Sequence, residues 1–235
     1  DEDAVKRYCE VNETEGALLT GSVRPIVLLR KREGVRLVTG LADGLSELGV
    51  MLPYTPIQHM LLHCFDGMLV MTSGNLHDEP IVTDDEEAYT VLGNVADAFL
   101  GHNRDIVARY DDSVVRVLSF GEGRGVQMIR RARGYAPRPL AMPGNSSPLL
   151  ATGPEQKNTF CLVRDDEAFV SQHMGDMESA ATFDAWLEAE RRYERLFGIK
   201  PQSLACDLHP EYLTSKWAHE QDMPCIEVQH HHAHI

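Results

Sequence analysis

Four histidines crowd into five positions at the end of the chain, in the segment Val228-Gln-His-His-His-Ala-His-Ile235. Neutral imidazole is the commonest side-chain ligand of transition metals in proteins. Residues four apart lie on the same side of a helix, so His230 and His234 could bind one metal ion together. The spacing predicts a metal site at these two residues. The alternatives are a polar run at a frayed terminus and an expression tag, but Ala233 interrupts the run and argues against a tag.

A cluster of arginines in an otherwise acidic chain is the second candidate site. The formal net charge is −14, yet the segment from Gly123 to Pro139 contains no acidic residue. Its arginines are Arg124, Arg130, Arg131, Arg133 and Arg138. Guanidinium groups bind phosphate and carboxylate oxygens through paired hydrogen bonds. We therefore predict a small-anion site in this segment, with a solvated basic loop as the alternative.

The tetrapeptide Thr72-Ser-Gly-Asn75 is the third candidate, because it follows the apolar run Gly67–Met71, which predicts a strand. Hydroxyl, amide and glycine backbone groups at a strand end can hold the phosphates or ribose of a nucleotide. An ordinary turn is the alternative, since serine, glycine and asparagine are common in turns.

The composition is that of a globular protein with two domains of ordinary size. The 235 residues are 43% hydrophobic and 25% charged. No apolar run approaches the ~20 residues of a membrane span, so we expect no membrane partner. Five cysteines without a CxxC pair indicate reduced thiols and a cytoplasmic location. The negative charge argues against a broad nucleic-acid surface.

The order of elements predicts how these residues are positioned. A run rich in proline and small polar residues predicts a linker at 142–148, between domains at 1–141 and 149–235. An acidic first turn at Asp84 predicts a helix that extends to Leu100. Beyond the linker, the predicted strands are 149–153, 159–163, 168–171, 204–208 and 225–229, with a turn at 164–167, a helix at 183–197 and a second helix that ends near residue 219.

Three antiparallel strands followed by helix, strand, helix and strand are typical of an actin-like or ribonuclease-H-like ATPase lobe. In that fold the loop from Gly153 to Asn158 faces the nucleotide phosphates. Asp176, Asp207 and His209 follow strand ends, where α/β sheets bind ligands. A generic α/β domain is the alternative, and the predicted fold class is α/β in either case.

In combination, these motifs resemble the HypF family, the carbamoyltransferases that mature nickel–iron hydrogenases. Residues 1–141 resemble the later part of its YrdC-like domain, a twisted mixed α/β domain. The matching stretches are Arg24-Pro-Ile-Val-Leu-Leu, Pro53-Tyr-Thr-Pro-Ile-Gln-His, Met71-Thr-Ser-Gly-Asn-Leu, Glu79-Pro-Ile81, Asp111-Asp-Ser-Val-Val-Arg116 and Arg130-Arg-Ala-Arg-Gly-Tyr-Ala-Pro137.

The rest of the chain, from residue 149, resembles the first part of the family's second nucleotide-binding domain, an actin-like ATPase domain similar to the threonylcarbamoyl-adenosine-forming ATPases. The matching stretches are Gly153-Pro-Glu-Gln-Lys-Asn-Thr159, Ser171-Gln-His-Met-Gly-Asp176, Asp207-Leu-His-Pro-Glu-Tyr212 and the histidine-rich segment 228–235.

The resemblance implies an adenylate-forming carbamoyltransferase. In that family carbamoyl phosphate is hydrolysed, the carbamate is adenylated by ATP with Mg, and pyrophosphate leaves. The carbamoyl group then passes to the C-terminal cysteine of the partner HypE, as the precursor of the cyanide ligands. The implied nucleotide or carbamoyl-adenylate ligands are Thr72, Ser73, Asn75, Ser113, Arg116, Arg130, Arg131 and Arg133. The implied phosphate loop contains Gly153, Lys157 and Asn158, and the implied ligands of iron or zinc are His230 and His234.

Several parts of the family pattern have no counterpart in the chain. They are the acylphosphatase domain, the CxxC zinc fingers, the start of the YrdC-like domain and the later half of the ATPase domain. We therefore expect a fragment that ends in an incomplete ATPase lobe and does not complete the reaction by itself.

Two other functions fit parts of the sequence. A threonylcarbamoyl-adenosine synthase for tRNA would contain the same two domain types, although the net charge of −14 argues against a tRNA partner. The Arg-Gly-Tyr-Ala-Pro stretch and the triple histidine are closer to the hydrogenase factor. A non-catalytic module that binds anions and a metal is the third possibility.

Overall fold

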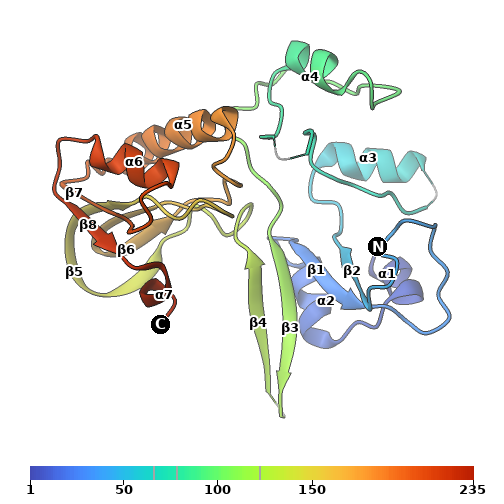
Figure 1. Ribbon diagram of the computed structural model, residues 1–235. Helices are drawn as coiled ribbons and strands as arrows, with labels where there is room; N and C mark the ends of the chain where they lie inside the picture. Colours follow the sequence, from blue (N-terminus) through green and yellow to red (C-terminus); the bar gives the residue numbers. More distant parts are fainter. Residues whose placement is uncertain (66, 78, 122) are drawn as a thin grey trace. The chain divides into compact units, whose positions relative to one another are not determined.

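The computed structural model describes residues 1–65, 67–77, 79–121 and 123–235. The chain forms two compact units (Figure 1). The first unit comprises residues 1–71 and 112–135, and the second comprises residues 72–111 and 136–235. Each unit contains one four-stranded mixed sheet with helices, which confirms the predicted α/β class.

In the first unit the strand order is β2-β1-β3-β4. Strand β1 (Ile26–Arg30) pairs antiparallel with β2 (Glu47–Val50) and parallel with β3 (Val114–Phe120). Strand β3 forms an antiparallel hairpin with β4 (Gly123–Arg130). Helices α1 (Glu2–Tyr8) and α2 (Glu13–Thr20) contribute to a core whose fully or nearly buried members are Val5, Cys9, Leu19, Val27, Leu29, Leu52 and Val115.

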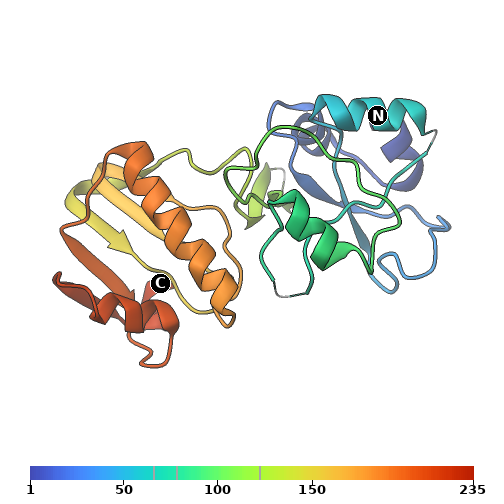
Figure 2. The ribbon, with the colours of Figure 1, turned by 90° about the horizontal axis from the view of Figure 1, so that it is seen from above.

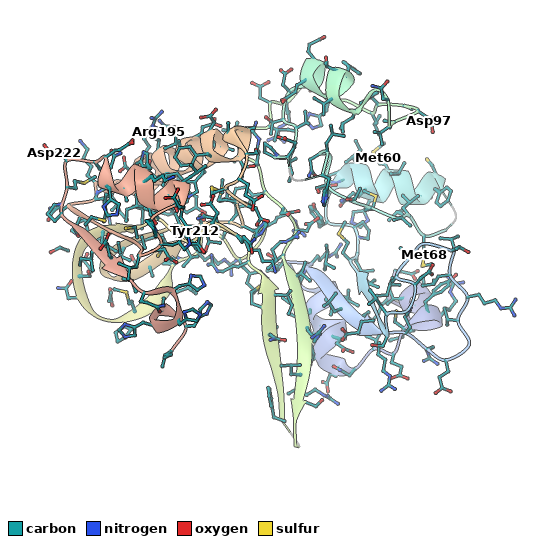
Figure 3. The ribbon with its side chains drawn as sticks, in the orientation of Figure 1. Met60, Met68, Asp97, Arg195, Tyr212 and Asp222 are labelled. Atoms are coloured by element: carbon teal, nitrogen blue, oxygen red, sulfur yellow. The ribbon has the colours of Figure 1, made fainter. Side chains whose placement is uncertain are left out.

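Helix α3 (Pro56–Cys64) begins at a proline that follows the N-cap residue Thr55. Thr55 and Gln58 form a capping box there, and Pro56 occupies the first turn, where a missing N–H costs no helical bond. Much of its apolar surface is exposed: Met60, labelled in Figure 3, is 69% exposed.

Two predictions for the middle of the chain are wrong. Residues 67–71 do not form a strand, because they lack a pairing strand among the described residues. Helix α4 (Asp85–Leu92) stops well before Leu100. Gly93 follows its last residue, and glycine is disfavoured in a helix by about 1 kcal/mol relative to alanine.

The second unit has the strand order β6-β5-β7-β8. Strand β5 (Leu140–Ala151) pairs antiparallel with β6 (Cys161–Val170) and parallel with β7 (Ser203–Asp207), which pairs parallel with β8 (Cys225–Val228). Helices α5 (Ala180–Phe197) and α6 (Leu213–His219) cover one face of this sheet (Figures 1 and 2). The short helix α7 (His230–Ala233) follows β8.

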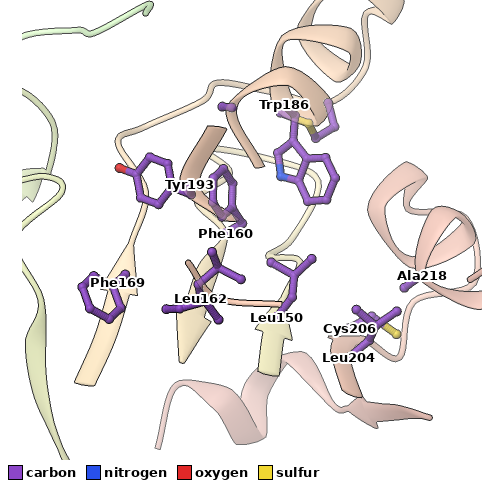
Figure 4. Close-up of a cluster of buried hydrophobic side chains, with 12 residues drawn as sticks. Leu150, Phe160, Leu162, Phe169, Trp186, Tyr193, Leu204, Cys206 and Ala218 are labelled. Atoms are coloured by element: carbon purple, nitrogen blue, oxygen red, sulfur yellow. The ribbon is translucent and has the colours of Figure 1, made fainter. Parts of the chain in front are cut away.

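Aromatic side chains fill the core between this sheet and α5 (Figure 4). The rings of Trp186 and Tyr193 from α5 meet Phe160 edge-on, with ring centroids 5.7 and 5.0 Å from that of Phe160. Ser179 caps α5, and Gly198 ends it in the left-handed conformation. This core fixes the strand ends on which the candidate site depends.

The structure corrects the predicted strands of this unit. Residues 142–148, expected as a linker, lie within β5, and residues 164–167, expected as a turn, lie within β6. The two stretches support each other, since Ser146 pairs with Asp165 across the ladder. The long strand β5 thus pairs with the charged middle of β6. The ten-residue strand β6 therefore takes the place of the two short strands predicted at 159–163 and 168–171. The predicted division into domains at 1–141 and 149–235 stays a prediction.

Two further features concern the chain as a whole. None of the helices in the described ranges has the length and apolarity needed to cross a bilayer. All five cysteines are free thiols: Cys64 on α3 is exposed, Cys9 and Cys206 are buried, and Cys161 and Cys225 are partly buried. The sulfur atoms of Cys206 and Cys225 lie 3.4 Å apart on β7 and β8. Burial and the neighbouring Cys225 raise the pKa of Cys206 to about 12.

Candidate functional site

The ends of β7 and β8 bring the histidine-rich segment next to an acidic residue. The two strands are parallel, and Asp207 at the end of β7 is paired with Val228 at the end of β8. The N–H of Leu208 donates to the carbonyl of Val228 and extends the ladder by one bond. The residues just after β8 are therefore held beside Asp207.

His230 and His234 face each other, as their spacing predicts. Their Nε2 atoms are 3.2 Å apart, and their ring centroids are 4.9 Å apart. Two imidazole nitrogens, each about 2.0–2.1 Å from a zinc-type ion, would stand at a similar separation. Within the described ranges no cluster of three or more metal-ligating side chains is present. The chain thus supplies a pair of imidazole donors at this position.

Asp207 holds His230 from the other side of the ring. Its Oδ2 is 2.7 Å from Nδ1 of His230, and its Oδ1 accepts from the N–H of His209 at 2.9 Å. The carboxylate side chain is only 8% exposed. His209 in turn stacks on Tyr212, labelled in Figure 3, with ring centroids 4.2 Å apart.

The predicted phosphate loop follows β5 in the same unit. Gly153 has a φ of 76°, and a Cβ atom there would lie 2.2 Å from the carbonyl oxygen of Thr159, so only glycine fits. Lys157 is exposed, and its N–H donates to Asp176 Oδ1 at 2.6 Å. Asn158 is fully buried, and its amide donates to the carbonyls of Thr152 and Pro154. Lys157 is thus at the surface of the loop, whereas Asn158 holds the loop in shape.

Helix α6 is tied to the same loop. Thr214 Oγ1 donates to the carbonyl of Gly153 at 2.9 Å, and Glu155 accepts from the N–H of Leu213 at 2.9 Å. These contacts fix the loop relative to β7, which ends at Asp207.

In the first unit, Arg133 is engaged by the protein on every side of its guanidinium. Its Nε donates to Asp112 at 2.5 Å, and Nη1 and Nη2 donate to the carbonyls of Val23 and Arg24. The group lies over the Tyr54 ring, 3.4 Å from the centroid. Burial and the charge of Asp112 raise the pKa of Tyr54. Sequence reasoning missed Tyr54 and Val23, because neither carries a signal that points to a distant arginine.

Ser113 is also committed to internal contacts. It is fully buried, its Oγ donates to the carbonyl of Arg133 at 2.9 Å, and the N–H of Ala132 donates to it at 2.8 Å. Arg116 pairs with Glu47 at 2.6 Å, and Arg131 donates to the carbonyl of Tyr135 at 3.0 Å. Arg130 is the last residue of β4.

Thr72, Ser73 and Asn75 belong to the second unit. Thr72 and Ser73 are exposed. The amide of Asn75 donates to the carbonyls of Leu76 and Glu79, at 2.9 and 3.0 Å, and closes a tight loop. Thr72 and Ser73 are thus at the surface, whereas the amide of Asn75 is bonded within its own segment.

Comparisons with known families match both parts of the chain. A family model described as the HypF Kae1-like domain matches residues 144–235. A model of the Sua5, YciO and YrdC type, described as telomere recombination, matches residues 1–132.

Curated relatives extend over nearly the whole chain. Carbamoyltransferase HypF2 of Cupriavidus necator is 48% identical over 97% of the chain and 31% of its own length. Carbamoyltransferase HypF of Synechocystis is 42% identical over 98% of the chain and 30% of its own length. The chain thus spans a little under a third of these relatives.

Solved structures agree with this similarity. A crystal structure of full-length HypF in a phosphate- and nucleotide-bound form has a TM-score of 0.94 and 47% identity, and the match covers 100% of this chain and 37% of that one. The crystal structure of HypF from T. kodakarensis has a TM-score of 0.91 and 37% identity, over 100% of this chain and 31% of that one.

Proposed function

The chain belongs to the HypF family, and from that premise we propose that it takes part in ATP-dependent carbamoyl transfer for hydrogenase maturation. The observation that supports this most strongly is the 42–48% identity to relatives named carbamoyltransferase, over nearly the whole chain. Because the chain spans a little under a third of those relatives, the activity, substrates and partners are proposals throughout.

The proposed chemistry has three steps. Carbamoyl phosphate loses its phosphate to water and yields carbamate. A carbamate oxygen then attacks the α-phosphorus of ATP, which forms carbamoyl-adenylate and releases pyrophosphate, with Mg on the phosphates. Finally, the C-terminal cysteine thiolate of HypE attacks the carbamoyl carbon, and AMP leaves.

The absence of paired cysteines among the five thiols fits a cytoplasmic location.

For the first unit we propose that Arg130 and Arg131, at the end of β4, contribute positive charge near the leaving pyrophosphate. Arg133 would contribute by position, since its guanidinium contacts are to Asp112, Val23, Arg24 and the Tyr54 ring. Ser113 would likewise support the segment that presents the arginines, because it joins Ala132 and Arg133 to β3. Arg116 stays a proposed ligand whose charge is partly balanced by Glu47.

We propose further nucleotide contacts from two separate loops. Thr72, Ser73 and Asn75 would offer hydroxyl and amide groups to the nucleotide or carbamoyl-adenylate of the YrdC-like domain, and the loop from Gly153 to Asn158 would serve the following ATPase-like domain. Lys157, at the surface of the glycine-containing loop, would meet phosphate oxygens, while Gly153 and Asn158 hold its shape. The nucleotide named for one of the solved relatives fits such a role.

We propose that His230 and His234 are two ligands of a divalent metal, iron or zinc, to which other groups would complete the coordination. Their Nε2 separation of 3.2 Å fits a shared ion. A metal bound there would act as a Lewis acid toward carbonyl or phosphate oxygens.

Exchange of labelled pyrophosphate into ATP tests the adenylation step. The purified full-length enzyme is given carbamoyl phosphate in one reaction, and threonine with bicarbonate in another. Exchange with carbamoyl phosphate is expected. Exchange only with threonine and bicarbonate would instead indicate threonylcarbamoyl-adenosine synthesis, and a protein that fails to bind ATP would favour the non-catalytic module.

A further inference from the structure

We propose that Asp207 is a positioning residue for the metal site: its carboxylate selects the tautomer of His230 whose Nε2 lone pair faces His234. The inference rests on the metal site of the proposed function. It names a residue at the end of β7, whereas the histidines follow β8, and it assigns that residue a task distinct from binding the metal.

The first support is the contact itself. Oδ2 of Asp207 lies 2.7 Å from Nδ1 of His230. A carboxylate can only accept, so the proton of the neutral imidazole sits on Nδ1. The lone pair is then on Nε2, which lies 3.2 Å from Nε2 of His234. Asp207, His230 and His234 thus form one chain of contacts in which the metal-binding atom faces its expected partner.

The second support is the rigidity of the carboxylate. Its other oxygen accepts from the N–H of His209 at 2.9 Å, and the side chain is 8% exposed. The backbone is held as well, because Ser215 Oγ donates to the carbonyl of Asp207 at 2.8 Å and the residue is paired with Val228. A fixed acceptor leaves the His230 ring one favourable orientation, which is the role that carboxylates play behind metal-binding histidines.

These contacts make Asp207→Asn a sharp test. The asparagine has a single acceptor oxygen, which the N–H of His209 would take. Its NH2 group would then face Nδ1 of His230 and donate to it. That reversal favours the tautomer with the proton on Nε2, so the lone pair would no longer face His234. The shape of the side chain is nearly unchanged, and Asp222→Asn, at an exposed residue labelled in Figure 3, is the matched control.

The first measurement needs no metal. Nitrogen-15 NMR of the imidazole rings, in the metal-free chain at a pH where they are neutral, should show the Nδ1–H tautomer of His230 in the parent and the control. The Nε2–H tautomer should increase in Asp207→Asn. An Nε2–H ring in the parent, or identical spectra for parent and variant, would overturn the inference whatever the metal site does.

The second measurement is a titration with cobalt(II), followed by its visible absorption. We expect Asp207→Asn to bind roughly 10–100-fold more weakly than the parent. Its thermal unfolding should stay close to that of the control, which excludes loss of the fold. A parent that binds no cobalt would sink the proposed metal site and this inference with it. Binding by the parent that Asp207→Asn leaves within about twofold would sink the inference alone.

Discussion

The guanidinium carbon of Arg133 lies 3.4 Å from the centroid of the Tyr54 ring. The same group bonds Asp112 and the carbonyls of Val23 and Arg24. One side chain therefore connects the segment after β4 to three other segments of the first unit. Arg133, which the sequence suggests as an anion ligand, therefore stabilises the fold of the first unit.

We predict that Arg133→Lys destabilises the first unit by roughly 1–3 kcal/mol, because an ammonium cannot reproduce three directional contacts and the stacking on Tyr54. Both tryptophans, Trp186 and Trp217, lie in the second unit, so tryptophan fluorescence would not report on unfolding of the first unit. Amide hydrogen exchange over residues 112–135 is therefore the suitable measurement. Arg124→Lys, at an exposed residue of β4, is the control. Unchanged exchange together with lost nucleotide affinity would show that Arg133 acts on the ligand directly.

Gly134→Ala should also loosen the first unit. Gly134 has a φ of 86°, and an added Cβ would lie 2.5 Å from Cγ1 of Val23. Gly34 has a φ of 75° with no atom within 4 Å of the same position, so Gly34→Ala carries the backbone strain without the clash. We expect Gly134→Ala to cost about 1–3 kcal/mol more than this control. Hydrogen exchange measures both, and adding Val23→Ala should recover part of the difference. No recovery would mean that the clash is not the cause.

Stability of the second unit should fall as the pH rises. Burial, followed by the charge of Glu194, raises the pKa of Glu190 on α5 from 4.5 to about 8. The folded chain therefore holds this proton more tightly than the unfolded chain. Its stabilising effect is complete below pH 4.5 and is lost progressively up to about pH 8. A difference of one pH unit between the pKa values of the folded and the unfolded chain corresponds to about 1.4 kcal/mol in the free energy of unfolding. This is an upper bound, because the site can relax.

Glu190→Gln removes this titration, so its free energy of unfolding should change less between about pH 5 and about pH 9 than that of the parent. The free energy of unfolding is measured by urea unfolding, with tryptophan fluorescence as the signal, since Trp186 lies on the same helix. Glu178→Gln, at an exposed residue, should keep the slope of the parent. Equal slopes for the parent and Glu190→Gln would contradict the prediction.

Lys157 and Asn158 should respond to substitution in different ways. Lys157→Ala is expected to weaken ATP binding roughly tenfold and to leave thermal unfolding unchanged, because only an exposed charge is removed. Lys200→Ala, at another exposed lysine of the same unit, is the control. Calorimetric titration with ATP gives the affinity, and equal affinities for the two variants would remove Lys157 from the proposed phosphate site.

Asn158→Asp should instead destabilise the second unit by about 1–3 kcal/mol. It would replace an amide that donates to two carbonyls with an acceptor that faces them. Tryptophan fluorescence during urea unfolding would register the loss, and an unchanged transition would mean that the loop does not depend on this amide.

The sequence predicted that His230 and His234 face each other, because the cause is local: residues four positions apart lie on the same side of a helix. The α/β class followed from periodicity in the same way. Residues 142–148 were misread because proline, glycine and serine usually break strands, whereas here the partner strand β6 decides.

The contacts that define the candidate sites are less predictable. Arg133 and Tyr54 meet only once the first unit has folded, and Asp207 reaches His230 only through the register of β7 and β8. Such pairs have no spacing rule, since they depend on how strands align rather than on distance along the chain. Asp207 could be placed at a strand end from the sequence, but its partner could not.

The uneven exposure of the thiols allows one cysteine to be labelled selectively. A maleimide dye reacts with the thiolate form, and the raised pKa values of Cys9 and Cys206 keep that form scarce near neutrality. Cys64 on α3 is exposed, so brief labelling should place a fluorophore there first, without any engineered cysteine. The native chain thus carries its own attachment point for following helix α3 in solution.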